Sequence, residues 1–399
     1  MTRWAKSRLG DVADLCLGKM LDEQKNKGDL LPYLANVNVR WGEFDLENLR
    51  EMRFAHNEMD RYGLKFGDIV MCEGGEPGRC AIWKESVPGT MIQKALHRIR
   101  PHKCLDYRYL FYFFLHTGRT GGFAPLFTGA TIKHLPKQSL SKLEIEYPPL
   151  GMQERIAELL STYDDLIENN RRRMSLLEES ARLLYREWFV RLRFPGYEHT
   201  PIVDSVPQGW ERRTAFDSMH VLSGGTPKTS MPDYWDGETP FFTPKDATDG
   251  IWVSTCERSV TELGIQNCNS KLYPRDTVFI TARGTVGKLN MAQVPMAMSQ
   301  SCYALVGKDH LSQRFVYSAM EAGVDALRQQ AVGAVFDAIV VDTFKRINLM
   351  VPPVPLLHLF DEATAPIFDQ VESLTQQNEK LRAARDLLLP RLMSGELAV

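Results

Sequence analysis

The sequence has 399 residues and a mass of 45.5 kDa, enough for two or three domains. Hydrophobic residues make up 44% of the chain and charged residues 25%, which excludes a disordered or fibrous protein and favours folded domains with apolar cores. The formal net charge is -2, and neither half is strongly basic, so charge alone does not indicate a nucleic-acid-binding protein.

Membrane insertion, secretion and disulfide bonding are not expected. No stretch approaches the 18 or so consecutive apolar residues that a transmembrane helix needs. The first six residues lack the apolar core and the cleavage site of a signal peptide. The seven cysteines are scattered and form no C-x-x-C pair, so neither a disulfide framework nor a zinc site is predicted. These features together predict a cytoplasmic protein.

Residues 1–150 predict a first globular domain of the α/β (α+β) class. Short runs of β-branched and aromatic residues at 68–72, 96–99 and 143–147 are bounded by Gly, Pro and Asp, which is typical of strands. A helix is expected over 107–116. Its many aromatic residues are interpreted as part of a core that packs the helix, and not as a platform for stacking bases.

Residues 151–194 predict one long helix. From Ile156 to Trp188, apolar residues recur at alternating intervals of four and three, which is the pattern of a heptad seam. With a rise of about 1.5 Å per residue, such a helix is too long for one small domain to cover, so it must pack against a partner helix. A linker is expected over 195–208.

The second half of the chain repeats this order. Residues 209–353 predict a second globular domain, and residues 354–399 predict a second long helix. The expected elements of this domain are strands over 277–280, 303–306 and 347–351 and a helix over 313–322. Local similarities recur in the same order, with a constant offset of 204 residues from Gly129 and Gly333 onward, which indicates an internal duplication.

The two long helices are predicted to form an antiparallel coiled coil. In the register that respects the duplication, the residue numbers of two facing positions add up to 548. Apolar pairs then mark the two ends of the seam: Ile156 faces Leu392, and Trp188 faces Phe360. The same register places Asn170 opposite Asn378, and such a polar pair fixes register at a cost in stability. Alternatively, each asparagine side chain turns toward solvent. Pro366 and Pro390 predict a kink or fraying near each end of the second helix.

Several short motifs occur in the chain in a fixed order. They are Ser223-Gly224-Gly225-Thr226-Pro227-Lys228, Tyr234-Trp235, Thr243-Pro244-Lys245-Asp246, Gly284-Thr285-Val286-Gly287-Lys288, Pro148-Pro149-Leu150 with Gln153-Glu154-Arg155-Ile156, and Arg186-Glu187-Trp188-Phe189 before Phe194-Pro195-Gly196-Tyr197. Together with the order domain, helix, domain, helix, they resemble the specificity subunit of type I restriction–modification systems over the whole chain. The first domain departs from the pattern, because Leu17-Gly18-Lys19 lacks the fuller glycine-threonine-proline run.

The resemblance implies a non-enzymatic subunit with two target-recognition domains, each reading one half of a bipartite site in double-stranded DNA. The helix pair would set the gap between the half-sites and dock two modification subunits, which use S-adenosylmethionine to methylate adenine. Two restriction subunits would supply ATP- and Mg-dependent translocation and cleavage. No cofactor is then expected in this chain. Two alternatives are a protein–protein scaffold and an inactive specificity-like subunit that does not bind DNA by itself.

The residues themselves agree with this division of labour. The chain has no G-x-G-x-x-G motif, and the loop at 284–288 lacks the spacer of a phosphate-binding loop. Tyr147-Pro148-Pro149-Leu150 lacks the amide of the similar adenine-methyltransferase motif and is interpreted as the entry to a helix. The histidines are dispersed, without the spacing of metal ligands. We therefore predict no catalytic and no metal-binding residue.

The candidates for DNA contact are basic side chains on loops, next to small residues that allow close backbone approach. They are Lys19, Arg40, Arg79, Arg119 and Lys133 in the first domain, and Lys228, Lys245, Arg283 and Lys288 in the second. Each could instead be a solvated surface charge. Because the net charge is near zero, we expect the isolated chain to bind DNA weakly, with partner subunits completing the clamp.

Overall fold

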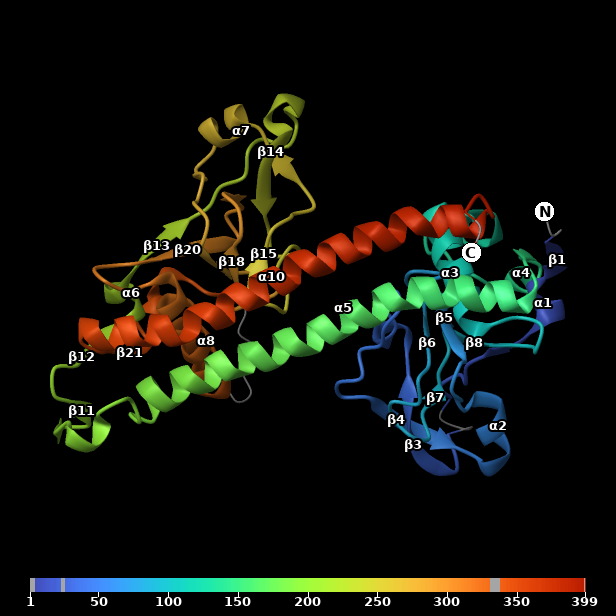
Figure 1. The fold of residues 1–399 in the computed structure, drawn as a ribbon, viewed down its shortest axis with the longest axis horizontal. Coiled ribbons are helices and arrows are strands. Elements are labelled where there is room, and N and C mark those ends of the chain that lie inside the picture. The colour runs from blue at the N-terminus through green and yellow to red at the C-terminus, as the bar shows by residue number, and fades with distance from the viewer. Residues whose placement is uncertain (1–3, 23–25, 331–337, 398) are drawn as a thin grey trace. The chain divides into compact units, whose positions relative to one another are not determined.

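The computed structural model describes residues 4–22, 26–330, 338–397 and 399 (Figure 1). It separates into two compact units, one formed by residues 1–167 and 380–399 and the other by residues 168–379. Each unit therefore combines one globular domain with a segment of each long helix. Each unit is of mixed helix and strand content, as the sequence predicts.

The first unit is built on a four-stranded antiparallel sheet in the order β2-β8-β5-β6. A second sheet has the order β4-β3-β7, and β1 pairs with β9. The strands are β1 (Ala5–Arg8), β2 (Ala13–Leu17), β3 (Asp29–Leu34), β4 (Arg50–Phe54), β5 (Ile69–Cys72), β6 (Cys80–Ile82), β7 (Met91–Ile92), β8 (Leu96–Pro101) and β9 (Glu144–Tyr147). The helices of the domain are α1 (Leu9–Val12), α2 (Met59–Tyr62), α3 (Tyr107–Arg119) and α4 (Lys137–Leu140).

Helix α3 packs against one face of the four-stranded sheet (Figure 1). The Asp106 side chain caps its first turn by accepting hydrogen bonds from the backbone N–H groups of Arg108 and Tyr109, at 2.9 and 3.0 Å. The side chains of Tyr109 and Phe114 are fully buried among residues of β5 and β8. The aromatic run is therefore core, as predicted.

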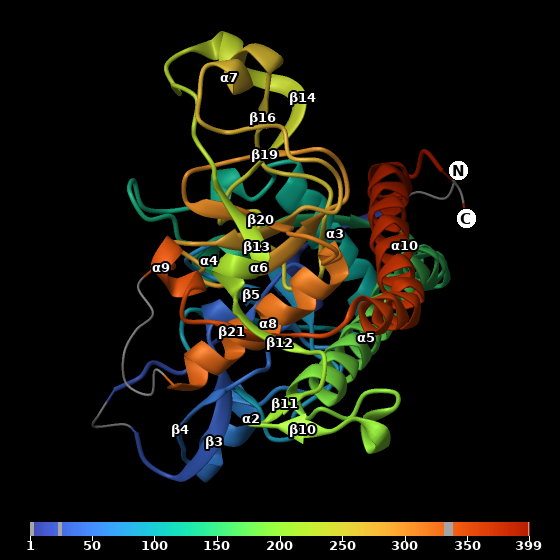
Figure 2. The same ribbon diagram turned by 90° about the vertical axis from the view of Figure 1, so that its left-hand side faces the viewer.

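The second unit repeats this plan with a five-stranded sheet in the order β13-β20-β17-β18-β15. A smaller sheet has the order β16-β14-β19, and β12 pairs with β21. The strands are β12 (Glu211–Thr214), β13 (Met219–Ser223), β14 (Trp235–Phe242), β15 (Trp252–Val253), β16 (Ser259–Val260), β17 (Val278–Thr281), β18 (Leu289–Ala292), β19 (Ala297–Met298), β20 (Cys302–Gly307) and β21 (Asn348–Val351). The helices are α6 (Ala215–Ser218), α7 (Glu262–Gln266), α8 (Gln313–Gln330) and α9 (Val341–Phe344), and α8 packs against the large sheet (Figure 2).

The strand pairings make the duplication explicit. β2 pairs with β8 from Ala13 opposite Pro101, and β13 pairs with β20 from Met219 opposite Gly307, an offset of 206 residues on both strands. The same offset relates the residues that cap the next helix of each unit. Asp106 caps the N-terminus of α3, and Ser312 caps the N-terminus of α8. All six strands and both short helices expected from the sequence are present in these positions.

The two long helices are α5 (Leu150–Tyr185), which continues into a π-helical turn (Arg186–Val190), and α10 (Val354–Met393). The predicted fraying of α10 near its two prolines is wrong, because the helix continues through both. Pro366 and Pro390 lie on the exposed side of α10, so water can satisfy the carbonyl groups that each proline frees. The nearby side chains of Phe368 and Leu389 are buried and hold the helix in place.

Segments of α5 and α10 pack together within each unit. In the first unit, Ile156 of α5 belongs to the same buried cluster as Leu392 of α10. In the second unit, the rings of Trp188 and Phe360 meet edge to face, with their centroids 5.9 Å apart. The structure therefore confirms the contact between Trp188 and Phe360, and it places Ile156 and Leu392 in one apolar cluster.

Candidate nucleic-acid interface

Three loops of the second unit converge at the ends of its strands. The loop at 282–288 is joined to the loop at 243–248 by a hydrogen bond from Thr285 Oγ1 to the carbonyl oxygen of Pro244, at 3.0 Å. The loop at 224–230 is held where the Gly225 N–H donates to the carbonyl oxygen of Met298, at 3.1 Å. The carbonyl oxygen of Ser301, three residues after Met298, accepts a hydrogen bond from the Ala282 N–H at 2.8 Å, which connects this segment to the loop at 282–288. Three of the four motifs named in this domain thus lie on loops that hydrogen bonds connect, directly or through residues 298–301.

Basic side chains project from each of these loops. Lys228, Lys245 and Arg283 are exposed, and none makes a side-chain hydrogen bond or ion pair within the described ranges. Lys288 differs, because its Nζ lies 2.7 Å from Asp249 Oδ1 and only a third of its side chain is exposed. The charged groups of Lys228, Lys245 and Arg283 are therefore available to an external anion. The charge of Lys288 is partly neutralised by Asp249.

The loop around Lys245 is held by Asp246, which belongs to a motif noted in the sequence but was not among the candidate residues. The Asp246 carboxylate accepts hydrogen bonds from the Thr243 N–H at 2.8 Å, from Thr243 Oγ1 at 2.6 Å and from the Glu257 N–H at 2.7 Å. The spacing of Thr243 and Asp246 is a signal for such a turn and could have been read as one. The threonine and aspartate of this motif thus position the lysine between them.

A buried asparagine supports the same loop from below. Asn290 is fully buried on β18, and its Nδ2 donates to Thr248 Oγ1 at 2.8 Å and to the carbonyl oxygen of Gly250 at 2.7 Å. No local pattern in the sequence indicates this contact, because some 40 residues separate donor and acceptor. Satisfied buried amides of this kind fix backbone position.

The glycine pair of the first motif serves internal packing. A Cβ at position 224 would lie 2.3 Å from the carbonyl oxygen of Ser299, and one at 225 would lie 2.7 Å from the backbone nitrogen of Asn269. Neither position tolerates a side chain without a backbone shift. Close packing against neighbouring backbone therefore explains why glycine occupies positions 224 and 225. The expected role of these small residues in allowing DNA to approach is not needed to explain them.

The first domain does not present Lys19 as predicted. Its side chain is 4% exposed, and its Nζ lies 2.5 Å from Glu58 Oε2 and 2.9 Å from the carbonyl oxygen of Arg53. Although burial acts to raise it, the pKa of Glu58 is lowered by the hydrogen bond and the charge of Lys19. A buried ammonium group that is already paired is a structural contact, so the assignment of Lys19 to DNA binding is corrected.

The side chain of Arg119 is paired within the protein. Arg119 ends α3, where its Nη1 lies 2.6 Å from Oδ1 of Asp386 on α10. The side chain is therefore tied to a long helix and is not a free group on the glycine-rich loop that follows. Sequence reasoning could not find this partner, because the two residues are distant in the chain.

The remaining candidates of the first domain lie on loops. Arg79 binds Glu76 at 2.6 Å and the carbonyl oxygen of Asn36 at 3.0 Å, while Arg40 binds the carbonyl oxygen of Val37 at 2.5 Å. Arg40 and Arg79 are thus brought to the same segment, and Arg40 stays about half exposed. Lys133 is exposed on its own loop, where its Nζ lies 6.0 Å from the ring of Phe127.

The coiled-coil asparagines meet in the second unit. Asn170 Nδ2 donates to Asn378 Oδ1 at 3.0 Å, and the two side chains are 6% and 2% exposed. The alternative in which both turn toward solvent is therefore wrong. A single buried amide pair in an apolar seam defines one register between two helices.

Within residues 4–22, 26–330, 338–397 and 399, no group of three or more His, Cys, Asp or Glu side chains is arranged to hold a metal ion. Within the same ranges, no helix combines the length and the apolar character needed to span a bilayer.

Comparison with known proteins explains this architecture. The model of the family described as the type I restriction modification DNA specificity domain matches residues 1–179 and, separately, residues 207–384. The chain belongs to this family. The two matches of the specificity domain correspond to the two halves of the duplication.

Relatives of the specificity family cover the full length of the chain. The MjaIX specificity subunit of Methanocaldococcus jannaschii is 24% identical over 99% of this chain and 94% of that protein. The HindI specificity subunit of Haemophilus influenzae is 20% identical over the whole of both chains. The crystal structure of a type I restriction–modification S subunit from M. genitalium has the same fold, with a TM-score of 0.55, 16% identity and coverage of 98% of this chain and 96% of that one.

Proposed function

We propose that this chain reads a bipartite site in double-stranded DNA, with each globular domain contacting one half-site. The observation that carries the proposal is the surface formed by three converging loops of the second unit, from which Lys228, Lys245 and Arg283 project without internal partners among the described residues. Family membership of both halves supports the assignment of one half-site to each domain. Exposed Lys and Arg groups of this kind bind phosphates and the edges of guanine bases.

We further propose that the chain contributes recognition and no catalysis within a larger cytoplasmic assembly. Two modification subunits would carry S-adenosylmethionine and methylate adenine, and two restriction subunits would carry the ATP- and Mg-dependent activity. The helix pair would dock the modification subunits and hold the two half-sites at a fixed spacing. The paired asparagines support such a spacing role, because they allow one register only.

The first test of DNA recognition is a methylome. The full chain is expressed with its modification subunit, and single-molecule sequencing records adenine methylation across the genome. We expect a bipartite methylated motif that disappears when this chain is omitted. A stable complex of the two subunits that methylates no motif would overturn the proposal and favour a scaffold or an inactive specificity-like subunit.

The loop residues are tested in the same assembly. We expect Lys245→Ala, Lys228→Ala and Arg283→Ala each to weaken DNA binding, and each lost phosphate contact to reduce the slope of log K against log salt by about 0.9. Arg346→Ala is the matched control, since this exposed arginine lies outside the three loops. Equal effects of the control and the three loop variants would remove the loops from the interface.

A further inference from the structure

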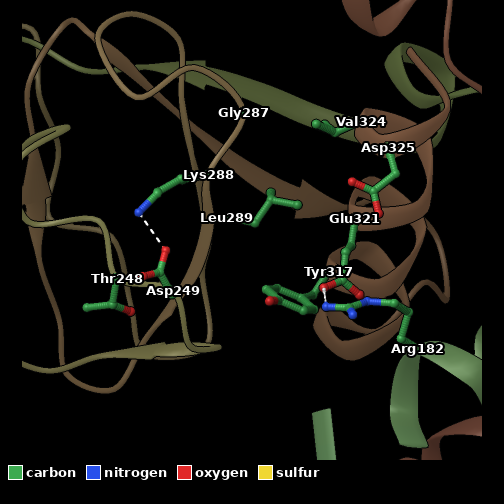
Figure 3. Close-up of a pocket in the computed structure, with 10 residues that line it drawn as sticks. All are labelled: Arg182, Thr248, Asp249, Gly287, Lys288, Leu289, Tyr317, Glu321, Val324 and Asp325. Atoms are coloured by element: carbon green, nitrogen blue, oxygen red, sulfur yellow. Dashed lines mark hydrogen bonds and ion pairs between the residues drawn. The ribbon is translucent and has the colours of Figure 1, made fainter. Parts of the chain in front are cut away.

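In each unit, an ion pair connects the globular domain to the long helix that the other half of the sequence supplies. In the first unit, Arg119 of α3 binds Asp386 of α10 at 2.6 Å. In the second unit, Arg182 of α5 binds Glu321 of α8 at 2.9 Å (Figure 3). We call these two contacts the crossed ion pairs. In both, the N-terminal half (first domain plus α5) meets the C-terminal half (second domain plus α10).

The two crossed ion pairs occupy equivalent places in the duplication but have opposite polarity. On the long helices, Arg182 and Asp386 are related by the offset of 204 residues. On the domain helices, the capping residues set the offset at 206, so Arg119 corresponds to Asp325, one turn beyond Glu321. Glu321 and Asp325 line the same cavity of about 230 Å³ as Arg182 (Figure 3). Thus the domain side is basic in the first unit and acidic in the second.

This reversal matters because the duplication offers each half an alternative partner, which is a second copy of itself. Two N-terminal halves joined by the same geometry would present Arg119 to Arg182 of the other copy. Two C-terminal halves would present Glu321 and Asp325 to Asp386. Like charges in such contacts oppose association and act as a specificity device.

The asparagine pair has the same effect. The offset of 204 relates Asn170 to Leu374 and Asn378 to Met174, so the amide pair occurs on one side of the pseudo-two-fold axis only. In a pair of N-terminal halves, Asn170 would face Met174 of the other copy, and in a pair of C-terminal halves Asn378 would face Leu374. A buried amide that faces an apolar side chain loses its hydrogen bond.

We propose that the crossed ion pairs and the asparagine pair make each half of this chain select the other half and reject a second copy of itself. This selection would operate between halves of one chain and between neighbouring chains during folding. The inference concerns assembly and does not depend on DNA recognition, so it stands or falls separately from the proposed function.

The test uses the full chain, cut once in its linker. A protease site is placed between Asp204 and Ser205, at the exposed turn joining β10 (Ile202–Val203) and β11 (Val206–Pro207). The folded protein is cut, incubated, and analysed by native mass spectrometry, which distinguishes unlike pairs from like pairs by mass. We expect the cut wild-type protein to remain a pair of unlike halves.

Charge reversal should redirect this pairing. Arg182→Asp places a carboxylate against Glu321 in the unlike pair but offers that carboxylate to Arg119 in a pair of N-terminal halves. We expect the fraction of like N-terminal pairs to rise about tenfold or more, and Arg182→Asp with Glu321→Arg to restore unlike pairing. The control is Arg172→Asp, because Arg172 is an exposed arginine of the same helix that pairs with Glu168 on its own helix.

An independent variant covers the case in which Arg182→Asp fails to fold. Asp386→Arg opposes Arg119 in the unlike pair and offers a cation to Glu321 in a pair of C-terminal halves, so here the like C-terminal pairs should increase. The proposal is overturned if the cut wild-type protein redistributes into like and unlike pairs at random. It is also overturned if the Arg182 and Asp386 variants redistribute no more than the Arg172 control.

Discussion

The hydrogen bond between Asn170 and Asn378 allows a quantitative test of how the helix pair holds its register. Replacing Asn378 with leucine keeps a side chain of similar size but removes the acceptor, 3.0 Å away, of the Asn170 amide. Because Asn170 is 6% exposed, water reaches its amide poorly. We therefore expect Asn378→Leu to lower the free energy of unfolding by about 1–3 kcal/mol, the usual cost of a buried polar group that loses its partner.

The double variant separates this explanation from simple damage to the seam. Asn170→Leu with Asn378→Leu replaces both amides by apolar groups, so its stability should match or exceed that of the wild type, with a coupling free energy of about 1–3 kcal/mol. Urea unfolding followed by circular dichroism measures the four proteins of the cycle. Gln377→Leu, on the exposed side of α10, is the matched control, and its effect should be within about 0.5 kcal/mol. Additive losses in the double variant would refute the reasoning.

Three further predictions address pH, the core and the spacing role. Burial lowers the pKa of His97 below its ordinary value of 6.5, and the Nε2 atom of His97 lies 2.8 Å from the carbonyl oxygen of Leu135. The unfolded chain therefore binds a proton at this histidine more readily than the folded chain does. The free energy of unfolding should fall as the pH drops below about 6.5. Urea unfolding at several pH values should show this loss in the wild type and in the exposed control His102→Asn, but not in His97→Asn. If the free energy of unfolding of His97→Asn changed with pH as steeply as that of the wild type, the prediction would be contradicted. Phe360→Ala should lower the free energy of unfolding by about 3–5 kcal/mol, because the ring of Phe360 is fully buried. The control Leu359→Ala, at the adjacent exposed position, should have a small effect. Equal effects of the two variants in thermal or urea unfolding would contradict the assignment of Phe360 to the core. Deleting one heptad from each long helix should shorten the gap in the methylated motif, and a gap of unchanged length would exclude the helices as the spacer.

The sequence by itself predicted the duplicated order, both long helices, six of the strands, one helix in each domain, and the pairing of Asn170 with Asn378. Each of these depends on a short-range pattern or on a repeated one. Heptad spacing marks a seam whatever the rest of the chain does, and the offset of 204 residues then relates the two seams. The prolines of α10 show the limit of such local rules, because a helix held by buried neighbours on either side continues through Pro366.

Only the tertiary structure decided which basic residues are free to bind a ligand. Lys19 and Arg119 carry the same positive charge as Lys245, yet the fold pairs them with Glu58 and Asp386 and leaves Lys245 exposed. An ion pair requires two charges within about 4 Å, and for these pairs that proximity is created by strands and helices distant in sequence. Charge is a property of the residue, whereas its availability to DNA depends on the neighbours that the fold supplies.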